Sequence, residues 1–377
     1  MGNSSFYPVK KTLMGPGPSN VHPRVLEAMA RPTLGHLDPD FVGLMDDIKR
    51  LLRTAFQTEN DLTFPISAPG SAGMEACFVN LLEPGDKVIV CQNGVFGGRM
   101  KENVERCGAQ SIMVEDDWGK PIDLNKLEDS LRAHSDASVV AFVHAETSTG
   151  VSSDAAEISA LARGFDCLTI MDSVTSLGGS PLHLDRWQID AVYSGSQKCL
   201  SCPPGLSPVS FSERAATRIR ARKAKVQSWF LDLSLVMNYW NEGGARSYHH
   251  TAPVNAMYAL HESLVLLIEE GLEASWARHR NMHERLKSGL EEMGFHFLVE
   301  EPYRLPQLNS ILIPGQLVAS EASIRQRLLN EHNLEIGAGL GNLAGKIWRI
   351  GLMGYGASQE NVSTCLNAIK QVTRDLK

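Results

Sequence analysis

The chain has 377 residues, of which 43% are hydrophobic and 21% are charged, and its formal net charge is −7. This balance argues against a general nucleic-acid binder, and seven cysteines in so long a chain argue against a disulfide framework. No apolar stretch reaches the ~20 residues that a membrane helix needs, and no hydrophobic signal core begins the chain. We therefore expect a cytoplasmic globular protein with a large core, divided into two domains.

The first twenty residues are expected to form an N-terminal arm (1–20), polar at first and then rigid over the Gly-Pro-Gly-Pro-Ser-Asn run at 15–20. We expect the polar part to be ordered only where it packs on a partner subunit. Apolar residues then recur at helical spacing over 23–30 and 41–56. His36 lies in the loop between these helices, where a surface position is the simpler interpretation.

A strand over 63–67, a turn of small residues over 68–73 and a helix over 74–82 follow. A glycine-containing turn before a helix is typical of an anion site, because the first amides of the helix are free and its dipole is positive there. Gly70 and Ser71 are the candidates, whereas Pro69 has no amide proton to donate.

The next strand is predicted over 87–91, and the loop after it (92–99) carries Phe96 between glycines. An aromatic side chain with such small neighbours could stack on a planar ligand. The alternative is a loop phenylalanine that fills the core.

Three further apolar strands end in residues with reactive side chains. The strand over 137–144 precedes Thr147, the run over 168–171 ends in Asp172, and the strand over 191–193 leads into a turn of small residues that presents Lys198. Strands alternating with helices predict a mostly parallel sheet with helices on both faces, and ligands collect at the carboxyl ends of such strands.

Lys198 and Asp172 each allow two interpretations. A lysine between apolar segments is a candidate for a lowered pKa and for a Schiff base, although a surface lysine on a turn is the alternative. Asp172 could be a helix N-cap. Together the two side chains are the pair that pyridoxal phosphate requires: an amine for its aldehyde and an acid that keeps its pyridine nitrogen protonated.

The pattern changes near residue 270, so we expect a large domain over 21–270 and a smaller α/β domain over 271–377. The expected elements of the smaller domain are helices over 273–293, 321–331 and 359–376 and strands over 295–299, 310–314, 334–337 and 348–352. Arg349 lies inside the last of these strands. A buried guanidinium needs a carboxylate, either from a substrate or from a structural ion pair.

Three other segments could indicate a metal, redox or nucleic-acid site, but their residues do not favour one. Cys199 and Cys202 have the spacing of a redox or metal pair but no second pair, and His249-His250 should point to opposite sides of an extended segment. We therefore expect no metal. The basic segment 213–225 lacks interleaved aromatic residues, so we expect a solvated helix face that makes the site entrance positive, and no nucleic-acid site.

Several motifs in order carry a specific resemblance. They are Gly-Pro-Gly-Pro-Ser-Asn (15–20), Met-Asp-Ser-Val-Thr-Ser-Leu-Gly-Gly (171–179), Ser-Gly-Ser-Gln-Lys (194–198), Pro-Pro-Gly (203–205) and Tyr-His-His-Thr (248–251). Together they resemble the class V aminotransferases, and in particular those of the alanine–glyoxylate and serine–pyruvate type. The resemblance runs from about residue 13 to the last helix. It implies the fold type I architecture, pyridoxal 5'-phosphate as cofactor and a homodimer with shared active sites.

The resemblance also implies a role for each matching residue. Lys198 would bind the cofactor and act as general base, and Asp172 would hold the proton on the pyridine nitrogen. Gly70, Ser71 and Gln197 would hold the phosphate, Phe96 would stack on the ring, and Thr147 would lie beside the ring oxygen and the substrate carboxylate. Tyr248 and Thr251 would reach the neighbouring subunit's phosphate, and Arg349 with Gly15 would bind substrate. Phe96 departs from the family pattern, which usually has a larger or more polar aromatic there.

The predicted reaction transfers an amino group from alanine or serine to a 2-oxo acid such as glyoxylate or pyruvate. Ureidoglycine, 3-hydroxykynurenine or aspartate as donor stays open, because few pocket contacts decide that choice. A cysteine desulfurase would need a cysteine on a mobile loop, but Cys365 alone lies beyond residue 202 and falls in the predicted last helix. A dehydrogenase is disfavoured because the glycines at 337–341 miss the dinucleotide-binding spacing. A non-catalytic cofactor carrier would be expected to lack Lys198 or Arg349, and both are present.

Overall fold

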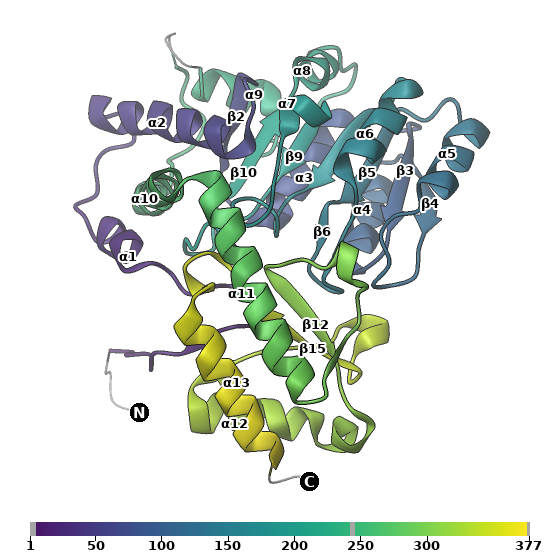
Figure 1. Ribbon diagram of the computed structural model, residues 1–377. Coiled ribbons are helices and arrows are strands. Elements are labelled where there is room, and N and C mark those ends of the chain that lie inside the picture. Colours follow the sequence, from purple (N-terminus) through teal and green to yellow (C-terminus); the bar gives the residue numbers. More distant parts are fainter. Residues whose placement is uncertain (1–4, 242–245, 375–377) are drawn as a thin grey trace.

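The computed structural model describes residues 5–241 and 246–374, which build a larger body around a seven-stranded sheet and a smaller body below it (Figure 1). Residues 1–4 of the expected arm and 375–376 of the expected last helix lie outside the described residues. The strands of the large sheet are β2 (Leu62–Ile66), β3 (Lys87–Gln92), β4 (Gln110–Glu115), β5 (Val139–Val143), β8 (Leu168–Asp172), β9 (Ala191–Tyr193) and β10 (Ser207–Phe211).

The large sheet has the strand order β2-β10-β9-β8-β5-β3-β4. β10 runs antiparallel to its neighbours β2 and β9, while the pairs from β9 to β4 are parallel. Every residue of the central strands β5 and β8 is buried, as expected for parallel strands covered on both faces. The predicted α/β fold with a mostly parallel sheet is confirmed.

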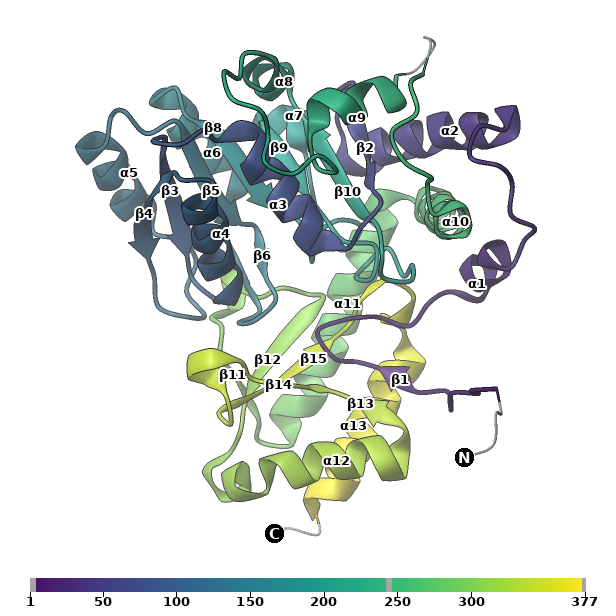
Figure 2. The same ribbon diagram turned by 180° about the vertical axis from the view of Figure 1, so that it is seen from behind.

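Helices cover both faces of this sheet. α3 and α4 lie on the face seen in Figure 2, and α6 lies on the opposite face seen in Figure 1. α1 and α2 both pack against α10. The helices of this body are α1 (Pro23–Met29), α2 (Pro39–Phe56), α3 (Gly70–Leu81), α4 (Val95–Arg106), α5 (Leu124–Ala133), α6 (Ala155–Gly164), α7 (Leu184–Trp187), α8 (Glu213–Arg220), α9 (Leu233–Tyr239) and α10 (Val254–Glu270).

The local sequence explains why these helices begin where they do. In α2, Pro39 occupies the first turn and the Asp38 side chain accepts a hydrogen bond from the Asp40 amide. α3 begins at Gly70 rather than at residue 74, so four of the six residues of the expected turn (68–73) are already helical. α4 begins at Val95, which places Phe96 in a helical turn and not in a loop as expected.

The smaller body is built on an antiparallel sheet of order β11-β12-β15-β14. Its helix α11 (Leu272–Glu292) crosses from the larger body into the smaller one (Figure 1). The other elements are β11 (His296–Phe297), η1 (Glu301–Tyr303), β12 (Leu308–Leu312), η2 (Gly315–Ser320), α12 (Glu321–His332), β13 (Leu334–Glu335), β14 (Gly337–Ala338), η3 (Gly341–Leu343), β15 (Ile347–Gly351), η4 (Gly354–Gly356) and α13 (Gln359–Arg374).

The N-terminal segment joins the smaller body. β1 (Thr12–Leu13) pairs in parallel with β13, and Met14 is fully buried in the second hydrophobic core with Trp348 and Ile350. The expected single strand over 334–337 was wrong in detail, because β13 pairs with β1 whereas β14 pairs with β15. The domain division at 1–20, 21–270 and 271–377 stays a prediction. In the described ranges, no helix has the length and apolar character to cross a membrane.

Candidate active site

Lys198 lies in a buried turn after β9, with 9% of its side chain exposed. Its ammonium donates a hydrogen bond to the carbonyl of Pro16. Gly17 (φ +105°) leaves the space that Lys198 fills, since a Cβ there would lie 2.6 Å from Nζ. Burial, with the nearby Arg349 charge, lowers the pKa of Lys198 to about 8. The surface-lysine interpretation was therefore wrong.

The turn that carries Lys198 is held from two sides. Ser196 donates through its hydroxyl to the Pro203 carbonyl at 2.7 Å, and its amide donates to Leu206 at 3.1 Å. From the N-terminal segment, the Ser19 hydroxyl donates to the Lys198 carbonyl at 2.7 Å. These bonds fix the backbone of the lysine while leaving its amine without a carboxylate partner among the described ion pairs.

Asp172 ends β8 and is 3% exposed. Its Oδ1 accepts from the Val174 amide at 2.8 Å, and its Oδ2 accepts from the Tyr193 hydroxyl at 2.7 Å. The bond to Val174 closes a local turn, and no α-helix begins there, so the N-cap interpretation was wrong. Burial raises the pKa of Asp172 to about 6, against the opposing effect of both hydrogen bonds and of Lys198.

The first turn of α3 faces the backbone just before Lys198. A Cβ at Gly70 would lie 3.3 Å from the Ser194 carbonyl oxygen and 3.6 Å from the Gly195 Cα. Pro69 is the N-cap residue and gives no side-chain hydrogen bond, so the first amides of α3 have no cap from it. Ser71, also in this turn, is exposed. Gln197 Oε1 is buried and has no hydrogen-bond partner among the described residues.

Thr147 and Arg349 meet from the two bodies of the protein. Arg349 donates through Nη1 to the Thr147 carbonyl at 3.2 Å and through Nε to the Ala338 carbonyl at 2.7 Å. Its side chain is buried, and burial lowers the pKa of Arg349 to about 10. No carboxylate of the described residues lies within ion-pair distance of it, so the structural ion pair was the wrong alternative. The Thr147 hydroxyl bonds to that of Thr175.

Two buried side chains at this site were missed by sequence reasoning. Tyr193 is one, on β9 beside Asp172. The other is Glu146 on β6 (Ala145–Glu146), which pairs with β7 (Val151–Ser152). Glu146 accepts from the Ser148 amide at 2.9 Å and from the Phe96 amide at 3.2 Å, and burial raises its pKa to about 7. A glutamate among small residues after an apolar strand was the available signal.

Comparison with known proteins identifies the family. The family description "Aminotransferase class-V" matches residues 13–360. The alanine–glyoxylate aminotransferase of the rabbit Oryctolagus cuniculus is 41% identical over 96% of this chain and 92% of its own. The crystal structure of alanine–glyoxylate aminotransferase from Nostoc sp. has a TM-score of 0.96 and 45% identity, covering 99% of this chain and 98% of that one. The (S)-ureidoglycine–glyoxylate transaminase of Bacillus subtilis is 38% identical over 96% of this chain and 90% of its own.

The chain belongs to the class V aminotransferases. It is therefore a transaminase of fold type I that depends on pyridoxal phosphate.

In this class V aminotransferase, Tyr248 and Thr251 lie at the surface. Tyr248 is 61% exposed, its hydroxyl lies 3.3 Å from that of Thr251, and its ring lies 5.3 Å from His36 between centroids. His249 and His250 do not point to opposite sides as expected, because their Nδ1 atoms lie 2.8 Å apart. His249 stacks on Trp229, and His250 bonds to the Ser67 hydroxyl at 2.7 Å.

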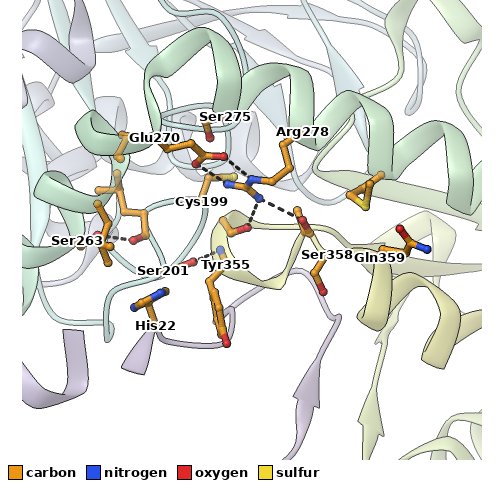
Figure 3. Close-up of a pocket in the computed structure, with 16 residues that line it drawn as sticks. His22, Cys199, Ser201, Ser263, Glu270, Ser275, Arg278, Tyr355, Ser358 and Gln359 are labelled. Carbon is orange, nitrogen blue, oxygen red and sulfur yellow. Dashed lines mark hydrogen bonds and ion pairs between the residues drawn. The ribbon is translucent and has the colours of Figure 1, made fainter. Parts of the chain in front are cut away.

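A cavity of about 410 Å³ is lined by Cys199, Leu200 and Ser201, which follow Lys198 in the chain (Figure 3). Cys199 and Ser201 form one wall, and residues of α10, α11, η4 and the start of α13 line most of the rest. Arg278 crosses it and pairs with Glu270, as Figure 3 shows. Neither Lys198 nor Asp172 lines this cavity, so it is separate from the proposed cofactor site.

The remaining expectations concern metals and the basic segment. In residues 5–241 and 246–374, no group of three His, Cys, Asp or Glu side chains could hold a metal, and all seven cysteines are free.

The basic segment 213–225 is not simply a solvated helix face. Arg218 pairs with Asp86 at 2.6 Å and Arg214 pairs with Asp190 at 3.0 Å. These carboxylates directly precede β3 and β9, so the two ion pairs hold α8 against the loops at that end of the sheet.

Proposed function

We propose that this aminotransferase transfers the amino group of alanine or serine to glyoxylate or pyruvate. The observation that carries the proposal is Arg349, a buried guanidinium near Lys198 with no carboxylate partner among the described residues. Such a cation is most stable when a ligand supplies the carboxylate, and every amino acid and 2-oxo acid does so. The names of the rabbit and Nostoc relatives support alanine and glyoxylate.

The residues present fit pyridoxal phosphate. Gln197 Oε1 is a buried polar atom without a partner in the described chain, and the first turn of α3 at Gly70 and Ser71 offers amides that no side chain caps. The uncapped amides suit a phosphate, whose oxygens accept hydrogen bonds at helix N-termini. Gln197 Oε1 is itself an acceptor, so Gln197 would donate to the phosphate through its amide Nε2. The set that would hold the cofactor within one subunit is Gly70, Ser71, Phe96, Thr147, Asp172, Gln197 and Lys198.

Phe96 would stack on the face of the cofactor ring. It lies in the first turn of α4, and the Arg99 guanidinium lies 4.8 Å from the centroid of the Phe96 ring. When bound, pyridoxal phosphate supplies a protonated ring that withdraws electrons from the substrate Cα. Asp172 would hold the proton on the ring nitrogen, because a buried anion stabilises a cation beside it.

Lys198 Nζ would remove the proton from the substrate Cα and return it. A pKa of about 8 suits this task, since far more of the amine is neutral near pH 7 than at the ordinary value of 10.5. Arg349 would hold the substrate carboxylate with two parallel hydrogen bonds, with Gly15 and Thr147 beside it. The backbone at Gly15 is close to this strand, because the Gly351 amide donates to the Met14 carbonyl at 2.7 Å.

Ureidoglycine as donor is the second candidate, favoured by the 38% identity to the Bacillus subtilis transaminase of that name. 3-Hydroxykynurenine and aspartate complete the alternatives. Amino donors differ in a few pocket contacts worth about 1–3 kcal/mol each. Turnover measured with each donor therefore decides which one the enzyme prefers.

We further propose a cytoplasmic homodimer with shared active sites. Large apolar side chains stay exposed around Tyr248, including Trp229 at 62% and Leu37 at 68%, and burial in a second subunit would remove them from water. Tyr248 and Thr251 would then reach the partner's cofactor phosphate. The seven free and buried thiols support a reducing compartment.

The test is Lys198→Ala with Lys225→Ala as control, since Lys225 is an exposed lysine. The first variant should lose turnover and the visible absorption band of the cofactor bound through its lysine, while the second keeps both. A donor panel against glyoxylate and pyruvate then separates the substrate classes. Retention of the band by Lys198→Ala would reject the site, and turnover restricted to ureidoglycine or bulky donors would reject alanine and serine.

A further inference from the structure

The Tyr193 hydroxyl and the Asp172 carboxylate form a hydrogen-bonded pair inside the sheet. The two residues are register partners on the neighbouring parallel strands β8 and β9, and side chains at paired positions project from the same face. Tyr193 Oη donates to Asp172 Oδ2 at 2.7 Å, and both side chains are almost fully buried. Nothing in the proposed chemistry above uses this phenol.

We propose that Tyr193 is a positioning residue, whose hydroxyl fixes the orientation of the Asp172 carboxylate and stabilises its charged form for the pyridine nitrogen of the cofactor. This inference rests on the role of Asp172 given under the proposed function. It assigns to Tyr193 an action through Asp172 and no contact with the reacting atoms.

The geometry shows how one phenol can set the carboxylate's orientation. Asp172 Oδ1 accepts from the Val174 amide, and Oδ2 accepts from Tyr193, so each oxygen is held by a donor from a different element. A carboxylate with one donor could rotate about its Cβ–Cγ bond, whereas two donors define its plane. Each oxygen keeps a further lone pair for the ring nitrogen proton.

The charge balance around Asp172 shows why a neutral donor matters. Burial opposes the carboxylate charge and raises its pKa to about 6, and Lys198 and Arg99 act in the opposite direction. Glu146 and Cys77 also face this region, and any negative charge on them disfavours that of Asp172. The hydrogen bond from Tyr193 offsets part of the desolvation cost.

Tyr193 is suited to remain a donor at every working pH. Burial and the adjacent Asp172 raise the pKa of the phenol well above its ordinary value. Tyr193 also packs in the main hydrophobic core, close to α3. A Cβ atom added at Gly73 would lie 3.2 Å from the Tyr193 Cβ. Phenylalanine would preserve that packing and remove only the hydroxyl, so it separates the two contributions.

The test compares Tyr193→Phe with Tyr239→Phe. Tyr239 is also buried, but its hydroxyl has no hydrogen-bond partner in the described residues, so the control removes a hydroxyl without removing such a bond. In apoenzyme with ¹³C-labelled aspartate, carboxyl NMR signals are titrated, and Asp172→Asn identifies the signal of Asp172. The dissociation constant of pyridoxal phosphate is measured separately.

For Tyr193→Phe we expect Asp172 to protonate at higher pH, and the cofactor to bind about 10- to 100-fold more weakly, as for loss of one hydrogen bond to a charged group. Tyr239→Phe should change neither. An unchanged Asp172 titration and unchanged cofactor affinity in Tyr193→Phe would overturn the proposal. If donors fail to turn over but the Asp172 titration moves, the proposed function fails and this pairing stands.

Site-specific 3-fluorotyrosine at position 193 keeps the test valid if Tyr193→Phe does not fold. Its phenol is more acidic and therefore a stronger donor, with almost the same volume. Asp172 should then protonate at lower pH than in the unmodified protein. A titration that is unmoved by the stronger donor would refute the inference.

Discussion

Gly354 lies directly against Ser201, three residues after Lys198: a Cβ atom at position 354 would overlap the Ser201 hydroxyl oxygen. The next amide, that of Tyr355, donates to the same oxygen at 2.7 Å. The 3₁₀ turn η4 of the smaller body thus interlocks with the turn that carries Lys198. The His279 ring accepts from the Gly354 amide at 2.9 Å and fixes η4 in turn.

Replacing Gly354 by alanine should therefore disturb the lysine turn. Gly354 has φ +53°, so the substitution adds backbone strain as well as overlap, and we expect the free energy of unfolding to fall by about 2–4 kcal/mol. Gly345→Ala is the matched control, because Gly345 has φ +71° and open space around it. Urea unfolding of both apoenzymes measures the difference. Equal losses would show that the interlock adds nothing beyond backbone strain.

Capture of pyridoxal phosphate by the apoenzyme should depend on pH through Lys198. Only the neutral amine attacks the aldehyde, and the lowered pKa of about 8 means that the neutral fraction grows as pH rises through that value. We expect the rate of capture to increase about tenfold per pH unit below pH 7 and to level off above pH 9. Stopped-flow absorbance measures it. A rate still rising tenfold per unit at pH 9.5 would indicate an ordinary lysine.

Arg349→Lys should weaken substrate binding selectively. A lysine cannot reproduce the two parallel hydrogen bonds of a guanidinium, so KM for alanine should rise about 10- to 100-fold. Ethylamine lacks the carboxylate and serves as the internal control, because its half-reaction should be affected far less. Steady-state kinetics measure KM for alanine, and absorbance under single-turnover conditions compares the half-reaction rates of alanine and ethylamine. A variant that slows both amines equally would place Arg349 outside carboxylate binding.

The sequence alone predicted the strands whose ends depend on neighbouring residues. The strands ending at Asp172 and before Lys198 are apolar runs bounded by small residues, so both were found within a residue of their observed ends. The resemblance added which of the remaining polar residues should gather there. Burial of Lys198 and Arg349 agrees with expectations drawn from apolar neighbours alone.

Features that depend on long-range contacts were not predictable in the same way. α10 was missed because it is buried on much of its surface, against α1 and α2, and so has a weak helical alternation. β13 and β14 were predicted as one strand because the sequence does not show that they belong to different sheets: β13 pairs with β1 near the N-terminus, whereas β14 pairs with β15. Tyr193 was interpreted as a strand residue, since only its pairing register brings the phenol to Asp172.

Shared active sites can be tested with mixed dimers of two defective chains. A Lys198→Ala subunit keeps Tyr248, and a Tyr248→Ala subunit keeps Lys198. If Tyr248 serves the neighbouring site, each hybrid dimer holds one intact site and one site that lacks both residues. Random reassociation of equal amounts makes half of the dimers hybrid, so activity at limiting cofactor should recover to about a quarter of that of the unmodified enzyme.

The control mixture keeps the Tyr248→Ala chain and replaces the Lys198→Ala chain by the double variant Lys198→Ala/Tyr248→Ala, so that no pairing places Lys198 and Tyr248 in one site. It should stay inactive, which excludes recovery by simple stabilisation of the subunits. Because Tyr248 is 61% exposed in the single chain, its removal should not unfold the subunit. If the first mixture is no more active than the Tyr248→Ala chain that it contains, Tyr248 does not act across the interface and each site is complete within its own subunit.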